Sequence, residues 1–336
     1  MRALCIRSQG PVEQRPLVMD ERPIPSPGEG EVLIRVETCG VCRTDLHIVE
    51  GDLPAQKLPI TPGHEVIGYV AACGPATKRF RPGSRVGVAW LHRSCGRCRF
   101  CTHGRENLCE HPTFTGWHVD GGYAEYMVAP EDFVYPIPQS LDAVETAPLL
   151  CAGIIGYRAF RMSEAGRGET LGLYGFGASA HIVLQIALHA GCRVFAVTRE
   201  PSRQQLARDL GAEWAGGLDE RPPVPLRSAI LFAPVGALVP VALEALDRGG
   251  TLAIADISMT PVPALDYERH LFYERKVVSV TANTREDGRS LLELAAEIPI
   301  RTHVEPFDLE QAQDALIAMK EGRLRGAAAV LRASAS

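Results

Sequence analysis

The chain has 336 residues, 46% hydrophobic and 22% charged, a length that favours two domains and a composition typical of globular enzymes. A formal net charge of −5 excludes general attraction to nucleic acid or an anionic membrane, and no apolar run approaches a membrane span. The ten cysteines cluster at metal-ligand spacings rather than as a disulfide framework, which predicts a reducing, cytoplasmic location.

The opening part of the chain is predicted to be β-structure punctuated by glycine and proline. Apolar and polar residues nearly alternate over 31–37, which indicates a half-buried strand. Further strand-like runs are found at 2–6, 66–71, 81–90 and 121–128. We expect these strands to form a twisted, partly closed β-barrel.

The loop after the strand at 31–37 carries Cys42, and His64-Glu65 opens the next strand. Catalytic zinc takes three protein ligands and keeps a fourth position open, so Cys42 and His64 are predicted ligands with Glu65 in or beside the ligand set. Asp45 would accept the other ring N–H of His64. The alternative is a buried structural cysteine beside a surface histidine.

Thr44 and His47 follow Cys42 on the same loop. A hydroxyl and an imidazole this close to a metal ligand predict a proton relay, which would carry the proton of an alcohol substrate outward.

The segment 92–112 contains Cys95, Cys98, Cys101 and Cys109 within fifteen residues. Four thiolates that leave no open ligand position are typical of a structural zinc site. An iron–sulfur cluster or two disulfides are the alternatives.

After about residue 140 the pattern changes to alternating helices and strands. Residues 141–165 are predicted to be largely helical, and an apolar strand at 169–174 leads into Gly175-Phe-Gly177-Ala178 and a helix at 181–189. A strand at 192–198 and a helix at 201–210 follow. This βαβ unit predicts a dinucleotide site, with the pyrophosphate over the start of the helix and Ala180 as the third small residue.

The remaining elements continue this alternation, with an irregular connection predicted at 216–227. Strands are expected at 228–233, 251–256, 276–281 and 327–332, helices at 236–247, 289–297 and 308–321, and a turn at Gly249-Gly250.

Thr198 stands at the end of the second strand, where NAD-dependent enzymes place an acidic residue. Arg199 and Arg203 follow it, and a hydroxyl with two guanidinium groups can bind a 2′-phosphate. We therefore predict NADP over NAD. The alternative is that both arginines are merely solvated residues at the start of a helix. Glu200 also weakens the positive field of the two arginines.

The chain resembles the zinc-dependent alcohol dehydrogenases of the medium-chain dehydrogenase/reductase superfamily. The resemblance rests on Gly40-Val-Cys-Arg-Thr-Asp-Leu-His47, Gly63-His-Glu65, the four-cysteine segment, Asp120-Gly-Gly-Tyr-Ala-Glu-Tyr126, Cys151-Ala-Gly and the Gly175/Gly177 turn. It implies a chaperonin-10-like β-barrel catalytic domain over 1–148, a Rossmann domain with a doubly wound parallel sheet over 149–283, and a return to the catalytic domain over 284–336.

The resemblance also implies residue roles. Cys151 would be the third catalytic zinc ligand. Together with the zinc of the four-cysteine segment, this implies two zinc ions per chain. Arg43 would contact the pyrophosphate. Leu53 and Trp90 would line the substrate pocket.

The predicted reaction is hydride transfer between a small or medium primary alcohol, or its aldehyde, and a nicotinamide cofactor. A broad aldehyde reductase, a zinc-free quinone reductase and a zinc-ribbon nucleic-acid-binding protein are the alternatives. The resemblance implies a homodimer or homotetramer, with no nucleic-acid or membrane partner.

Overall fold

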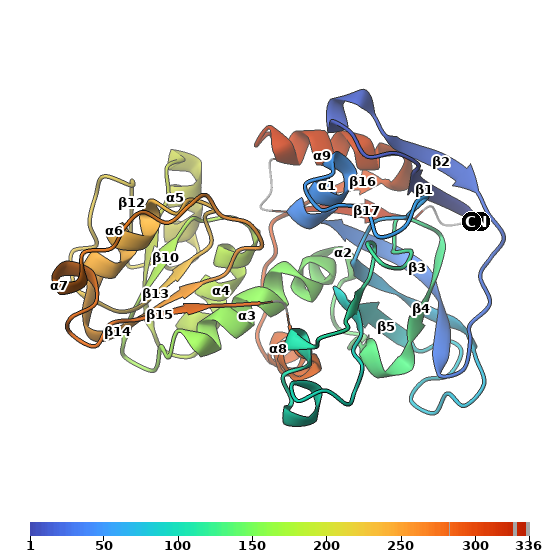
Figure 1. Ribbon diagram of the computed structural model, residues 1–336, viewed down its shortest axis with the longest axis horizontal. Coiled ribbons are helices and arrows are strands. Elements are labelled where there is room, and N and C mark those ends of the chain that lie inside the picture. Colours follow the sequence, from blue (N-terminus) through green and yellow to red (C-terminus); the bar gives the residue numbers. More distant parts are fainter. Residues whose placement is uncertain (282, 325–327, 334–336) are drawn as a thin grey trace. The chain divides into compact units, whose positions relative to one another are not determined.

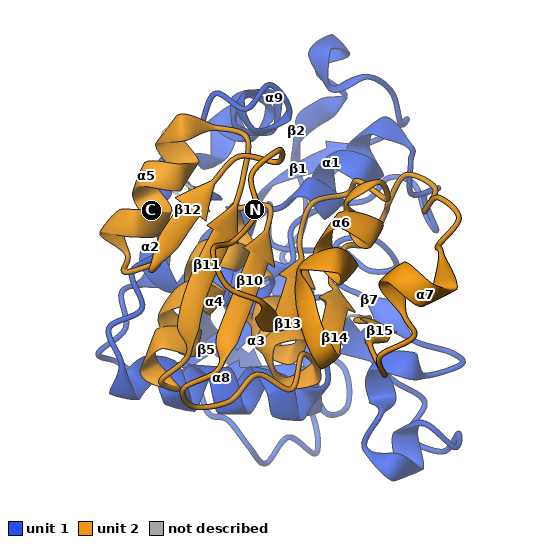
Figure 2. Ribbon diagram, turned by 90° about the vertical axis from the view of Figure 1, so that its left-hand side faces the viewer, with its two compact units in different colours: residues 1–151, 282–336 blue, residues 152–281 orange. Residues whose placement is uncertain are grey.

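The computed structural model describes residues 1–281, 283–324 and 328–333. The chain forms two compact units (Figure 2), residues 1–151 with 282–336 and residues 152–281. It therefore leaves the first unit once and returns to it. The functional domain bounds expected above, at 148 and 283, stay a prediction.

The first unit is built on a seven-stranded, mostly antiparallel sheet (Figure 1). The strand order is β16-β17-β3-β4-β5-β9, and β8 pairs with β3. Val32, Ile34 and Val36 of β3 are buried, whereas Arg35 between them is exposed. The sheet strands are β3 (Glu31–Val41), β4 (Glu65–Cys73), β5 (Arg85–Val88), β8 (Tyr126–Pro130), β9 (Val134–Pro136), β16 (Val304–Asp308) and β17 (Ala328–Arg332).

Two small antiparallel pairs and several short helices complete this unit. The pairs are β1 (Arg2–Ile6) with β2 (Leu17–Glu21) and β6 (Leu91–Arg93) with β7 (Thr113–Phe114). The α-helices are α1 (Arg43–Glu50), α2 (Ala143–Thr146), α8 (Arg285–Glu297) and α9 (Ala312–Lys320). The 3₁₀ helices are η1 (Val12–Gln14), η2 (Cys101–His103), η3 (Glu106–Leu108), η4 (Glu131–Phe133), η5 (Ala147–Leu150) and η6 (Leu309–Gln311).

The second unit is a six-stranded parallel sheet with helices on its faces (Figure 2). The strand order is β12-β11-β10-β13-β14-β15. Leu171, Leu173 and Ile230 are fully buried, as expected for parallel strands covered on both faces. The strands are β10 (Thr170–Tyr174), β11 (Arg193–Val197), β12 (Trp214–Gly216), β13 (Leu226–Leu231), β14 (Leu246–Ile254) and β15 (Lys276–Ser279), and the helices are α3 (Ala152–Met162), α4 (Ala178–His189), α5 (Pro201–Asp209), α6 (Leu238–Ala245) and α7 (Tyr267–His270).

Two sequence predictions about local structure are wrong. Residues 43–50 form helix α1 rather than a loop, because Cys42 and Asp45 cap its N-terminus. The stretch 141–165 is largely helical, as predicted, and is divided into α2, η5 and α3, with Pro148 in η5. Gly249-Gly250 lies inside β14 beside a register shift, not in a turn.

Other predictions agree with the structure. No helix joins β12 and β13 in the described residues 217–225, as the irregular connection at 216–227 implied. The last strand begins at Ala328, and residue 327 of the predicted strand lies outside the described residues. Within the described ranges, no helix has the length and apolar character needed to cross a membrane.

Candidate active site

Cys42 stands at the junction of β3 and α1. Its sulfur accepts a hydrogen bond from the backbone N–H of Thr44 at 3.5 Å, and the Asp45 carboxylate accepts one from the Cys42 N–H at 2.9 Å. This reciprocal capping satisfies free N–H groups of the first helical turn. The cap therefore fixes the position of the Cys42 thiol.

Asp45 also fixes the orientation of His64, which precedes β4. The Asp45 carboxylate lies 3.1 Å from His64 Nδ1 and accepts hydrogen bonds from the Gly63 N–H at 3.1 Å and the Tyr123 hydroxyl at 3.3 Å. A carboxylate at Nδ1 leaves the lone pair of Nε2 available for a metal.

His64 Nε2 is buried and has no hydrogen-bond partner among the described residues. Buried polar atoms are nearly always paired, so this atom calls for a partner that the protein itself does not supply. The Nε2 therefore fits a metal ligand.

Cys151, at the end of η5, completes the cluster. Its sulfur lies 3.7 Å from that of Cys42, which is too long for a disulfide but close to the ~3.8 Å between two thiolates on one tetrahedral zinc. The ligand atoms of Cys42, His64, Glu65 and Cys151 all lie within 4.8 Å of one another. This donor set fits zinc.

Charge interactions inside the cluster are strong because it is buried. The Cys151 thiol and His64 hold the pKa of Cys42 well below its usual range, whereas the contact with Cys42, together with burial, raises the pKa of Cys151. Burial raises the pKa of Glu65. Gly40 leaves room for this carboxylate, because a Cβ at residue 40 would lie 1.9 Å from Glu65 Oε2.

Two further glycines bring the backbone of residues 121–122 against this site. A Cβ at Gly121 would lie 2.0 Å from the Gly63 carbonyl oxygen, and one at Gly122 would lie 2.2 Å from a methyl of Val66. Asp120 accepts a hydrogen bond from the Thr61 N–H at 3.0 Å. The Asp-Gly-Gly sequence thus supports the loop that carries His64.

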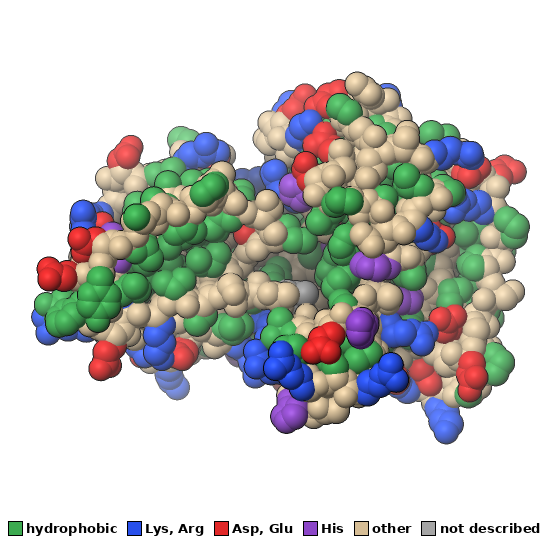
Figure 3. Space-filling model, viewed as in Figure 1, with side chains coloured by type: hydrophobic (Ala, Val, Ile, Leu, Met, Phe, Trp, Pro, Cys, Tyr) green, Lys and Arg blue, Asp and Glu red, His purple; other side chains and the backbone are tan. Residues whose placement is uncertain are grey.

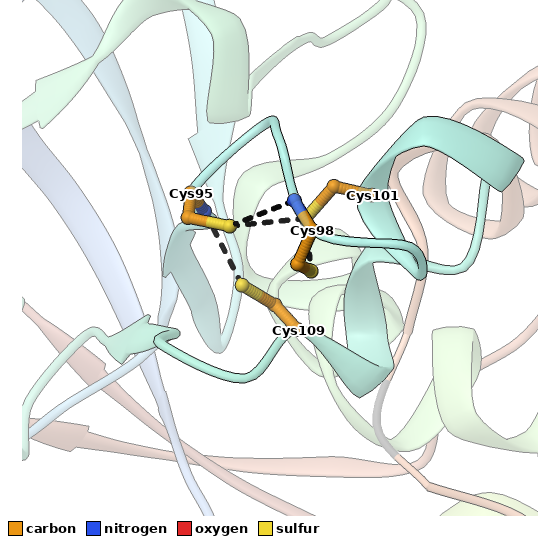
Figure 4. Close-up of side chains that lie close together, drawn as sticks. All are labelled: Cys95, Cys98, Cys101 and Cys109. Atoms are coloured by element: carbon orange, nitrogen blue, oxygen red, sulfur yellow. Dashed lines mark hydrogen bonds between the residues drawn. The ribbon is translucent and has the colours of Figure 1, made fainter.

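The four cysteines of the segment 92–112 point toward one another (Figure 4). The Cys101 sulfur lies 3.5 Å from the Cys98 sulfur and 3.9 Å from the Cys95 sulfur. Backbone N–H groups also donate to the sulfurs, for example that of Cys95 to Cys109 at 3.2 Å. Such donors stabilise thiolates, and they lower the pKa of Cys98 to about 6. Four sulfur ligands fit a closed, structural zinc site.

The predicted relay residues lie on α1 beside the first cluster. Thr44 is buried in the first turn, and His47 is partly buried one turn later. Arg43 is exposed at the start of the helix, and Leu53 is partly buried after its end.

The second unit holds the predicted dinucleotide residues. Gly175, just after β10, has a φ of 86°, and a Cβ there would lie 3.0 Å from the Ala233 backbone N. A Cβ at Gly177, the N-cap of α4, would meet no protein atom within 4 Å. Open backbone at an uncapped helix start suits a phosphate group. Ala178 begins the helix, and Ala180 is fully buried.

Thr198 directly follows the last residue of β11, at the edge of the parallel sheet where the strands end. Its hydroxyl lies 3.1 Å from Glu200 Oε2, and Arg199 Nη2 lies 3.4 Å from Glu200 Oε1. Arg203 is in the first turn of α5, with its N–H donating to the Glu200 carbonyl at 3.0 Å. Glu200 thus contacts two of the three groups predicted to bind a 2′-phosphate, the Thr198 hydroxyl and the Arg199 guanidinium.

Comparison with known proteins decides the family. Residues 28–139 match the alcohol dehydrogenase GroES-like domain. The chain is 48% identical to a probable alcohol dehydrogenase AdhA of Mycobacterium tuberculosis, over 98% of this chain and 97% of the relative. The chain belongs to the zinc-dependent alcohol dehydrogenases of the medium-chain dehydrogenase/reductase superfamily.

Other members of the superfamily match this chain over most of its length. An alcohol dehydrogenase of Geobacillus stearothermophilus is 40% identical over 89% of this chain and 90% of the relative. The solved structure of a cobalt- and zinc-bound thermostable alcohol dehydrogenase from Pyrobaculum aerophilum has a TM-score of 0.89 at 27% identity and covers 99% of both chains. The two units are thus the chaperonin-10-like and Rossmann parts of this family, and the chain is an oxidoreductase.

Sequence reasoning missed an aromatic wall beside His64 of this dehydrogenase. The Trp90 ring meets His64 edge-on, with centroids 5.0 Å apart, and stacks on Phe114 at 4.9 Å and Trp117 at 5.9 Å. The Trp117 indole donates to the Pro54 carbonyl at 3.0 Å. Phe114 and Trp117 carry no spacing signal in the sequence. Only the fold brings them to Trp90.

Proposed function

We propose that the chain catalyses the reversible oxidation of small to medium primary alcohols to aldehydes, with zinc and a nicotinamide cofactor. The observation that carries this proposal is the buried Nε2 of His64, without a partner in the described residues, beside the Cys42 and Cys151 thiols. These three residues would hold the catalytic zinc, with Glu65 beside it. When bound, zinc supplies a Lewis acid that lowers the pKa of the alcohol hydroxyl, and the nicotinamide accepts the hydride.

The residues of α1 would handle the proton. The Thr44 hydroxyl accepts the alcohol proton while it passes its own onward, and the His47 ring carries the proton toward solvent. Arg43 would bind the cofactor pyrophosphate through its guanidinium. The burial of Thr44 and the partial exposure of His47 support this direction of travel.

The four-cysteine segment would hold a second, structural zinc. Its ligand set has no open position, and it accounts for none of Cys42, His64 and Cys151. An interpretation of the chain as a zinc-ribbon nucleic-acid-binding protein is therefore not favoured, and the intact first cluster argues against a zinc-free quinone reductase.

The aromatic wall supports a substrate of limited width. Trp90 packs directly on His64 and is backed by Phe114 and Trp117, so the wall cannot move aside without unstacking three rings. We propose that it excludes bulky secondary alcohols. The reducing, cytoplasmic location stays a prediction.

The variant Cys42→Ser tests the proposal, because a serine hydroxyl is a poor zinc ligand. Zinc per chain should fall from about two to about one, and turnover should fall by roughly 10³-fold or more, since both the metal and the proton path depend on this site. Metal analysis and alcohol oxidation, measured from ethanol to benzyl alcohol with NAD and NADP, give both readouts. Cys73→Ser, outside both clusters, is the matched control. Full activity of the unmodified enzyme with one zinc per chain would contradict the proposal.

A further inference from the structure

Asp52 lies just beyond the end of α1, where its carboxylate meets the His47 ring. Asp52 Oδ2 is 2.7 Å from His47 Nδ1. The His47 side chain is 18% exposed and that of Asp52 is 64% exposed. The pair therefore extends from the partly buried ring to bulk solvent.

The turn that carries Asp52 is folded back onto His47. Gly51 has a φ of 95° and closes the helix as its C-cap. The N–H groups of Gly51 and Leu53 both donate to the His47 carbonyl, at 3.0 and 3.1 Å. The backbone on either side of Asp52 is thus fixed to the residue that its side chain contacts.

Gln9, in the loop between β1 and η1, forms hydrogen bonds with the same turn. Its amide donates to the carbonyls of Ile48 at 2.6 Å and Leu53 at 2.8 Å, and it accepts from the Ala55 N–H at 3.1 Å. An exposed aspartate side chain is ordinarily free to move. Here its backbone is held on both sides, so the position opposite Nδ1 is preorganised.

The other carboxylates of α1 are occupied elsewhere. Asp45 binds the Cys42 N–H and His64, and Glu50 binds Lys320 at 2.7 Å and the Val12 N–H at 3.0 Å. A carboxylate past the C-terminus of a helix is also electrostatically unfavourable, because the helix dipole is negative there. The His47 contact offsets this cost.

In a hydrogen bond between an imidazole and a carboxylate, the ring N–H donates and the carboxylate oxygen accepts. The proton between the two groups therefore resides on His47 Nδ1, which leaves Nε2 with the lone pair that takes up a proton.

We propose that Asp52 is a positioning residue for the His47 relay, an inference that rests on the relay role of His47 under the proposed function. In alcohol oxidation the substrate gives one hydride, with its electron pair, to the oxidised nicotinamide and releases one proton. The proton enters the His47 ring at Nε2, the ring holds it as imidazolium with Nδ1–H bound to Asp52, and the ring then releases it to water. Asp52 keeps the ring oriented and offsets its added charge.

The test compares Asp52→Ala with Asp52→Asn, since an amide oxygen keeps the hydrogen bond but not the charge. For Asp52→Ala we expect kcat for alcohol oxidation to fall about ten-fold, a part of the 10²–10⁴ that a proton-transfer group contributes. Zinc content and the alcohol KM should stay within about two-fold, and Asp52→Asn should lie between Asp52→Ala and the unmodified enzyme. Asp132→Asn, whose side chain is 70% exposed, is the matched control.

Chemical rescue separates positioning from a structural role. Added formate should restore much of the kcat of Asp52→Ala, whereas chloride at equal ionic strength should not, because only a carboxylate can take the place beside Nδ1. A kcat of Asp52→Ala within two-fold of the unmodified enzyme, or a loss that formate does not restore, overturns the inference.

His47→Gln distinguishes this inference from the function beneath it. If His47→Gln leaves kcat unchanged, the relay itself is wrong. If His47→Gln slows turnover and Asp52→Ala does not, only the role of Asp52 is wrong. The double variant should lose no more than His47→Gln alone, because Asp52 acts through that ring.

Discussion

The Thr198 hydroxyl lies 3.1 Å from the Glu200 carboxylate at the end of β11. Thr198 is 3% exposed and fixed after β11, whereas the side chains of Arg199 and Glu200 are 75% and 52% exposed. Exposed ion pairs contribute little free energy, so a dianionic 2′-phosphate can displace Glu200 from both partners. We therefore propose that NADP is preferred, with Arg203 as a further cationic contact.

Thr198→Asp combined with Arg199→Ala should reverse the preference. The new carboxylate repels the 2′-phosphate and can accept from the ribose hydroxyl of NAD. Losing the contacts with the 2′-phosphate should weaken the binding of NADPH by about 1.5–3 kcal/mol, roughly ten- to a hundred-fold in affinity. Ratios of kcat/KM for NADPH and NADH measure the effect.

Glu200→Gln is the companion variant, because it removes only the competing charge. It should raise the preference for NADPH. Equal efficiency of the unmodified enzyme with NADH and NADPH would reject the proposed preference.

The segment 92–112 has little apolar core of its own. Within the described residues 92–112, Cys109 is the only buried hydrophobic residue, and Leu91 is buried just before the segment. One contact ties it to α8: the Glu106 carboxylate accepts from the Arg285 N–H at 3.0 Å and from its Nε at 3.2 Å. Burial opposes ionisation of Glu106, but these bonds outweigh it and lower its pKa. A zinc ion is therefore expected to supply most of the stability of this segment.

Cys98→Ser should release the structural zinc and loosen this segment first. Losing about 3 kcal/mol or more would lower the Tm by roughly 6–12 °C for a domain of this size. Calorimetry with metal analysis checks this, and mild chelation of the unmodified enzyme should act in the same direction. Loss of one zinc without a change in Tm, or an equal shift in Cys73→Ser, would show that the metal does not stabilise the segment.

The sequence predicts elements well where one pattern dominates. The buried strands β10 and β11 and the helix α4 agree with the apolar runs and the Gly175/Gly177 turn. Residues 141–165 are largely helical, as their pattern predicts, but Pro148, whose missing N–H cannot continue an α-helix, lies where α2 changes to η5. The helix at 43–50 gives a weak signal in the sequence, because its N-cap is Cys42 and not one of the residue types that commonly cap helices.

For the site, short spacing predicts Cys42 and His64 but not Cys151, which is 109 residues from Cys42 in the chain. Only the resemblance assigned it. The Asp52 contact and the aromatic wall depend on distances between side chains that no spacing rule encodes.

The residues proposed to be functional are divided between the two units. Both groups of candidate metal ligands belong to the first unit, and Cys151 is the last residue before the chain enters the second unit. Gly175, Gly177 and Thr198 belong to the second. The first unit thus ends, just after η5, on Cys151, a proposed metal ligand.

The second unit also presents a surface that suits a second copy of the chain. β15 ends the parallel sheet and pairs only with β14 among the described strands. Exposed hydrophobic side chains gather around α7 just before it (Figure 3), with Tyr267 64%, Phe272 55% and Val277 40% exposed. An open strand edge beside an apolar patch favours pairing across a two-fold axis. We therefore propose a homodimer, or a homotetramer built from such dimers.

Val277→Asp should weaken this association, because it places facing carboxylates where two β15 edges would meet. Light scattering should give two or four times 36.4 kDa for the unmodified enzyme and a concentration-dependent shift toward the monomer for the variant. Val18→Asp, at a valine that is 45% exposed on β2 of the first unit, is the matched control and should leave the mass unchanged. Lys276, next to Val277, lies 2.8 Å from Glu164, so its charge is already partnered and does not by itself protect the edge. A monomeric unmodified enzyme at micromolar concentration would rule out pairing through β15.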